Sequence, residues 1–119
     1  MVSYLRRRTT VTWDSDELIV EFSPDRGELR VRVDQDGPIY RSFSLQLVAI
    51  VDGTRYPVVR CDCSHGSGPH RDFLNWDGST QRKAAMWEGM TYRDAFDHAY
   101  DDFSTNWQRY VEDFLRRRP

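Results

Sequence analysis

The chain has 119 residues and a mass of 14.1 kDa, so we expect one domain over residues 1–119 and exclude a multidomain enzyme. Hydrophobic residues make up 39% of the chain and aromatic residues 13%, which is enough for a core and argues against intrinsic disorder. The longest apolar run, at residues 47–51, is too short to cross a bilayer, and the first residues lack the apolar stretch of a signal peptide. The sequence therefore predicts a soluble, cytoplasmic protein with no membrane partner.

Positive charge is concentrated near the two ends of the chain, although the net charge is only −2. Three arginines stand at positions 6–8 and three more at positions 116–118, whereas the segment between them has an excess of acidic residues. Such runs usually keep a small domain soluble. If the two ends met in the fold, the six arginines would form a patch able to hold a phosphate backbone.

The first half of the chain alternates apolar and polar side chains, the pattern of half-buried strands. This pattern predicts an antiparallel β-meander of five strands over residues 9–62, with turns at residues 24–27, 36–38 and 52–53. In the third strand three residues should face the core and three should face water: Leu29, Val31 and Val33 inward, and Glu28, Arg30 and Arg32 outward. We expect a further short strand near residues 73–76 and a helical turn at residues 81–87.

From residue 91 onward the apolar positions follow the period of a helix. Thr91 followed three residues later by Asp94 resembles a capping box, and arginines gather at the far end, where a helix dipole favours them. The apolar positions form one stripe: Phe96, Ala99, Tyr100, Phe103, Trp107, Tyr110, Val111 and Phe114. The sequence thus predicts an α+β fold, an antiparallel β-meander of five to six strands packed against one long amphipathic C-terminal helix at residues 91–116.

Residues 61–89, between the predicted sheet and the predicted helix, are expected to form a functional loop rich in histidine and glycine. This segment holds both cysteines and two of the three histidines of the chain. Functional side chains tend to gather on loops held by a rigid scaffold. Three interpretations of this loop remain open from the residues alone.

The first interpretation is a metal site, because Cys61, Cys63, His65 and His70 are all zinc-ligand types. Two cysteines separated by one residue lack the spacing of a zinc knuckle, and on an extended strand they are also poorly placed for a disulfide, so we expect reduced thiols at a strand end. Asp62, His65 and His70 could instead hold a catalytic divalent metal ion. No cofactor is our main expectation, and this metal set is the alternative.

The second interpretation is metal-independent acid–base chemistry on a phosphodiester. His65 and His70 would act as general base and general acid, because imidazole changes its charge near neutral pH. Arg71 would stabilise charge on the phosphate, and Asp62 or Asp72 would orient a histidine. Three further residues would contact the substrate: Gly66, Gly68 and Asp72. The third interpretation is a surface that binds a protein or a nucleic acid without chemistry.

The order of these residues resembles a motif of a known family. Asp62, His65 and Gly66 are followed by Pro69, His70, Arg71 and Asp72, after a β-meander and before an amphipathic helix. This arrangement resembles the TumE-like toxin family of bacterial toxin–antitoxin modules, in which a further histidine commonly stands where this chain has Asp72. The resemblance implies a small cytosolic protein that restrains growth and is neutralised by a cognate antitoxin protein.

Two functions follow from these patterns. The leading hypothesis is a toxin-like effector, a ribonuclease by analogy with other small toxins, that acts through His65 and His70 with Arg71 and Asp62 in support. Its partners would be a cognate antitoxin, RNA and a second copy of the chain in a homodimer. The alternative is a protein-interaction module that has no catalytic activity.

Overall fold

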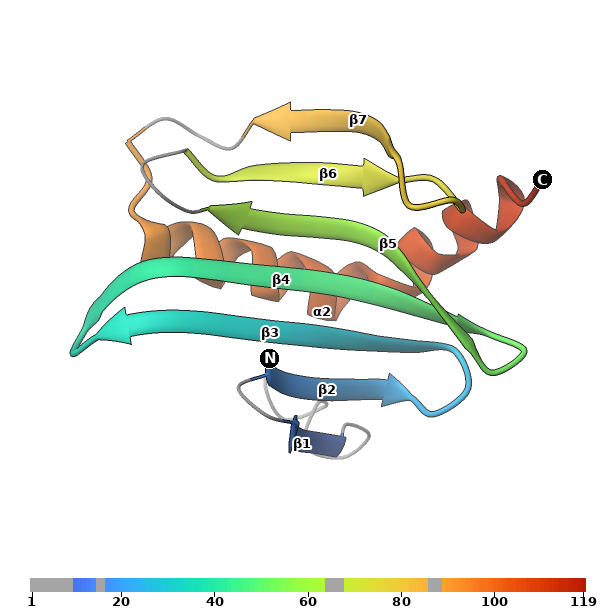
Figure 1. Ribbon diagram of the computed structural model, residues 1–119, viewed down its shortest axis with the longest axis horizontal. Helices are drawn as coiled ribbons and strands as arrows, with labels where there is room; N and C mark the ends of the chain where they lie inside the picture. Colours follow the sequence, from blue (N-terminus) through green and yellow to red (C-terminus); the bar gives the residue numbers. More distant parts are fainter. Residues whose placement is uncertain (1–9, 15–16, 64–67, 86–88) are drawn as a thin grey trace.

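The computed structural model describes residues 10–14, 17–63, 68–85 and 89–119. They form an antiparallel sheet of seven strands and one long helix (Figure 1). The strands are β1 (Thr10–Asp14), β2 (Glu17–Ser23), β3 (Gly27–Asp36), β4 (Ile39–Val51), β5 (Thr54–Cys63), β6 (His70–Leu74) and β7 (Thr80–Ala85), and the helix is α2 (Tyr92–Arg116). Each strand pairs with the next along the chain, so the predicted α+β meander with a C-terminal helix is confirmed.

The meander extends further along the chain than the sequence predicts. The expected functional loop at residues 61–89 contains the end of β5 and all of β6 and β7. Of the helical turn predicted at residues 81–87, residues 81–85 are strand, in β7. A tight turn makes this hairpin possible, because Gly78 adopts a φ of 88° and the Asp77 carboxylate accepts hydrogen bonds from Ser79. Pairing with β6 thus outweighs a weak local preference for helix.

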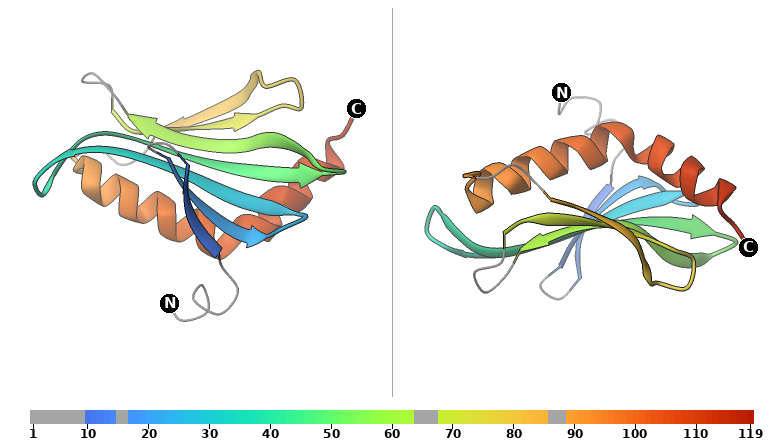
Figure 2. Two further views of the ribbon diagram at one scale, coloured as in Figure 1. Left: turned by 60° about the horizontal axis from the view of Figure 1, so that its bottom comes forward. Right: turned by 90° about the horizontal axis from the view of Figure 1, so that it is seen from above.

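Helix α2 lies across one face of the sheet, which we call the helix face (Figure 2). Its first turn is capped as predicted, since the Thr91 hydroxyl accepts a hydrogen bond from the Asp94 amide at 3.1 Å. The aromatic stripe of the helix packs on inward residues of β2 to β5. Fully buried members of this core include Leu29, Leu45, Leu47, Val59, Phe103 and Phe114.

The opposite face of the sheet, which we call the outer face, carries charged side chains in ion pairs. Glu28 was expected to face water, but only 3% of it is exposed, so that expectation is wrong. The reason is the cover provided by two long side chains, because Arg30 Nε lies 2.8 Å and Arg55 Nε 3.3 Å from the Glu28 carboxylate. In the described part of the chain, no helix has the length and apolar character needed to cross a membrane.

Candidate functional site

The predicted motif is divided between the two faces of the sheet, because residues 70–74 form a strand rather than a loop. Side chains alternate between faces along a strand. His70 and Asp72 therefore lie on the outer face, where their cross-strand neighbours on β5 are Asp62 and Arg60. Arg71 lies between them in sequence but points to the helix face, where it pairs with Asp102 of α2.

His70 contacts polar groups through both ring nitrogens. Its Nε2 lies 3.4 Å from Oδ1 of Asp62 and 3.7 Å from Oδ2 of Asp72, and its Nδ1 lies 3.3 Å from the carbonyl oxygen of Gly68. A protonated imidazole can donate to acceptors on both sides at once, whereas a neutral ring donates from one nitrogen only. With 31% of its side chain exposed, His70 is both positioned by the protein and open to a ligand.

Asp72 is the buried centre of the charges around His70. Its carboxylate lies 3.3 Å from Arg60 Nη2 and 3.9 Å from Lys83 Nζ, and only 6% of the side chain is exposed. Among the described residues, Asp72 Oδ1 has no hydrogen-bond partner. Asp72 was expected either to contact the substrate or to orient a histidine, and its burial suits the second role better.

Arg60 also reaches the other carboxylate of the cluster, with its Nε 3.5 Å from Oδ2 of Asp62. We call these five side chains the His70 cluster: Arg60, Asp62, His70, Asp72 and Lys83. Two basic and two acidic residues thus surround one imidazole. Arg60 and Lys83 carry no functional signal in the sequence, since only the register of β5, β6 and β7 brings them opposite Asp72.

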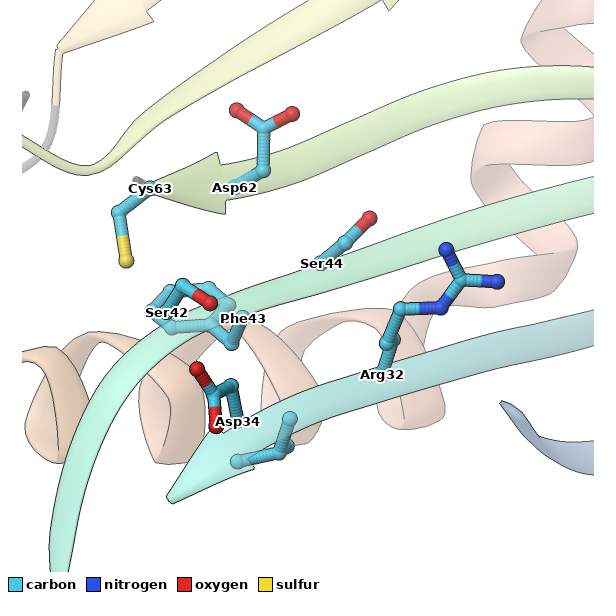
Figure 3. A pocket seen from close by; sticks show the side chains of 8 residues that line it. Arg32, Asp34, Ser42, Phe43, Ser44, Asp62 and Cys63 are labelled. Carbon is cyan, nitrogen blue, oxygen red and sulfur yellow. The ribbon is translucent and has the colours of Figure 1, made fainter. Parts of the chain in front are cut away.

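A shallow hollow of about 460 Å³ adjoins the His70 cluster at Asp62. Figure 3 shows the side chains of Asp62, Ser44 and Arg32, which rise from three neighbouring strands. The other lining residues are Val33, Asp34, Ser42, Phe43 and Cys63. Arg32 and the hydroxyls of Ser42 and Ser44 could hold the oxygens of a phosphate that carries a single negative charge. The carboxylates of Asp34 and Asp62 would repel an anion of higher charge.

Arg71 belongs to a polar group on the helix face, away from His70. Its Nη1 lies 3.1 Å from Oδ2 of Asp102, which also accepts a hydrogen bond of 2.6 Å from the Tyr110 hydroxyl. Burial, together with this bond to a carboxylate, raises the pKa of Tyr110 to about 12. The structure therefore gives Arg71 a role in joining β6 to α2, on the face of the sheet opposite to His70.

The remaining predicted site residues are placed as follows. Cys61 and Cys63 are buried on the helix face without a disulfide, and burial raises the pKa of the Cys61 thiol to about 12. Gly68 contributes its carbonyl oxygen to His70. His65 and Gly66 lie outside the described residues, as does any metal set that includes His65. In the ranges that are described, no three His, Cys, Asp or Glu side chains are grouped to hold a metal ion.

Comparison with protein families matches residues 13–119 to a domain of unknown function, DUF7718. The chain belongs to this family. The matched region of the DUF7718 domain contains the complete His70 cluster and all of α2. Comparisons with curated proteins and with solved structures give no match.

Proposed function

We propose that this DUF7718 domain is a small RNA-cleaving effector in which His70 carries acid–base chemistry. The observation that supports this most directly is the setting of His70, whose Nε2 lies 3.4 and 3.7 Å from two carboxylates on an accessible face. Arg60 and Lys83 add positive charge beside the same carboxylates. Imidazole between carboxylates and cations is suited to proton transfer at a phosphodiester.

RNA supplies its own nucleophile in the proposed reaction. The 2′-oxygen attacks phosphorus and loses its proton to a base, while the bond to the 5′-oxygen breaks and an acid protonates that oxygen. The products are a 2′,3′-cyclic phosphate and a 5′-hydroxyl. His70, protonated at Nε2, is the proposed acid. His65 is the proposed base, a role that comes from the sequence alone because this residue lies outside the described part of the chain.

The other members of the His70 cluster act through position and charge. Asp62 and Asp72 lie 3.4 and 3.7 Å from His70 Nε2 and help to fix the position of the ring, while the Nε2 proton passes to the leaving oxygen of the substrate. Arg60 is held by both carboxylates, and its side chain is 37% exposed, so it can turn part of its donor set toward a phosphate oxygen. In this proposal Arg60 takes the role that the sequence analysis gives to Arg71.

The biological setting in this proposal follows from the resemblance to TumE-like toxins. The effector acts in the cytoplasm, restrains growth, and is neutralised by a cognate antitoxin. The homodimer expected from the sequence stays a prediction. A light-scattering measurement of the purified chain tests it.

The chemical test compares the wild type with His70→Gln on a fluorescently labelled single-stranded RNA. We expect the variant to cleave at least 100-fold more slowly, the usual contribution of one acid–base group, and the wild-type products to end in a 2′,3′-cyclic phosphate. His98→Gln is the matched control, since His98 lies on α2 and outside the His70 cluster. Circular dichroism establishes that both variants fold.

Several outcomes would count against the proposal. Equal cleavage by wild type and His70→Gln would remove His70 from the reaction. Loss of cleavage in EDTA, with recovery on adding Mn²⁺, would favour the metal site of Asp62, His65 and His70. Absence of RNA cleavage by a folded wild type, together with normal growth of a bacterial host that expresses it, would favour the interaction module instead.

A further inference from the structure

A second concave site lies on the helix face, between the β6–β7 hairpin and the C-terminal half of α2. Its volume is about 470 Å³. Four arginines line it. Arg71 and Arg82 belong to the sheet, and Arg109 and Arg117 lie near the C-terminal end of α2. The aromatic residues Phe73 and Tyr110 also line it. We call it the arginine groove. It is distinct from the His70 cluster, because His70 and Arg71 point to opposite faces of β6.

The groove is held open by contacts that tie the hairpin to the end of the helix. Figure 1 shows the turn between β6 and β7 beside the last turns of α2. Trp76 Nε1 donates a hydrogen bond of 3.0 Å to the carbonyl oxygen of Phe114, and the Arg117 guanidinium donates to the carbonyl oxygen of Leu74 at 3.4 Å. The walls are therefore parts of one packed unit and need no rearrangement to form the site.

Positive charge in the groove is only partly compensated. Arg71 has Asp102 as its partner, and the acidic lining residue Asp113 is paired with Arg116 outside the lining. Within the described ranges, no carboxylate lies at ion-pair distance from three of the four lining arginines: Arg82, Arg109 and Arg117. An uncompensated cluster of guanidinium groups in a concavity attracts anions.

All four lining guanidinium groups lie over aromatic rings, those of Arg82 and Arg109 most closely. Arg82 Cζ lies 3.9 Å from the ring centre of Phe73, and Arg109 Cζ lies 5.0 Å from that of Tyr110. A guanidinium stacked on a ring keeps its N–H groups free to point sideways, and it loses less side-chain freedom when a ligand binds. The planar N–H forks of several arginines can bind one phosphate group together, because a phosphate presents more oxygens than a single carboxylate does.

We propose that the arginine groove binds phosphate esters. The ligand class is set by the charge of the lining arginines, by their fork geometry, and by a volume large enough for a nucleotide. A free nucleotide and the backbone of a nucleic acid present the same phosphate chemistry. This site would exist whether or not His70 cleaves RNA, so the two proposals stand or fall separately.

The test measures binding by titration calorimetry with three probes: 5′-AMP, a ten-residue oligothymidylate and hexaglutamate. We expect at least one of the two phosphate probes to bind the wild type, and Arg82→Gln with Arg109→Gln to weaken that binding at least tenfold. Both side chains are exposed, so this double variant should fold normally. The matched control is Arg41→Gln with Arg93→Gln, which removes the same charge from two side chains that are 59% and 60% exposed and lie outside the groove.

The control should bind within twofold of the wild type. If Arg82→Gln with Arg109→Gln weakens binding of oligothymidylate alone, the ligand is a nucleic acid backbone. If the double variant also weakens binding of 5′-AMP, the ligand is a free nucleotide. Either result supports a phosphate site. The proposal is overturned if neither phosphate probe binds at millimolar concentration. It is also overturned if both double variants lose affinity equally, or if hexaglutamate binds as tightly as the phosphate probes.

Discussion

Arg71 and Asp102 form an ion pair, with Nη1 and Oδ2 3.1 Å apart, that links β6 to the middle of α2. Each side chain is only 18% exposed, so water screens this pair less than an exposed one. Asp102 also accepts hydrogen bonds from Tyr110 and from Asn106, at 2.6 and 2.8 Å. One carboxylate on α2 therefore organises the polar contacts between the helix and β6.

Replacing Arg71 should lower the stability of the folded protein without abolishing RNA cleavage through His70. We expect Arg71→Gln to lower the free energy of unfolding by about 2–3 kcal/mol, because Asp102 then keeps a largely buried charge without its cation. Arg93→Gln is the control, since its exposed pair with Asp97 should be worth less than about 0.5 kcal/mol. Urea unfolding measures both. A fully stable Arg71→Gln that has lost RNA cleavage would return Arg71 to the catalytic role predicted from the sequence.

Gly27 should not tolerate a side chain. A Cβ at this position would lie 2.8 Å from Cε3 of Trp107, whose ring is stacked on Phe22 with 5.5 Å between centres. Because this contact lies between sheet and helix, we expect Gly27→Ala to cost about 1–3 kcal/mol of stability. Gly68→Ala is the comparison, because no described heavy atom lies within 4 Å of its added Cβ. Equal thermal stability of the two variants would show that Trp107 moves aside freely.

The cysteines should be inert in the folded protein. Burial raises the pKa of Cys61 to about 12, and burial also raises the pKa of Cys63. At pH 8 the reactive thiolate of Cys61 is then roughly one part in ten thousand, even before access is considered. We expect mass spectrometry to find no iodoacetamide adduct on either residue after an hour in buffer, and two adducts in guanidinium chloride. Rapid labelling of the native protein would contradict this placement.

The contribution of Tyr110 to stability should depend on pH above 10. Its folded-state pKa of about 12 lies above the ordinary value of 10, so folding favours the neutral phenol. This contribution is complete below pH 10 and is lost as the pH rises from about 10 to about 12. We expect Tyr110→Phe to be about 1–2 kcal/mol less stable than the wild type at pH 8, through the lost hydrogen bond to Asp102. The difference should shrink at pH 11, as measured by urea unfolding of both proteins, and a constant difference would refute the assignment.

Local periodicity predicts much of this fold because it depends on residues close together in the chain. Alternation places Leu29 and Val31 in the core, and the helical spacing places Phe103 and Phe114 there, as the structure confirms. The cap at Thr91 is likewise a contact between residues three positions apart. Each of these features is decided by the backbone geometry of a single strand or helix turn.

The tertiary structure decides which charges meet. Once residues 70–74 are known to form a strand, alternation alone separates His70 from Arg71, but that strand exists only because β5 and β7 pair with it. The contacts of Asp72 with Arg60 and Lys83 depend on the register between strands, and the arginine groove depends on where α2 crosses the sheet. Local pattern alone predicts the first five strands, the helix and most of their buried faces. The register between strands and the place where α2 crosses the sheet depend on packing between distant segments, which no local pattern encodes.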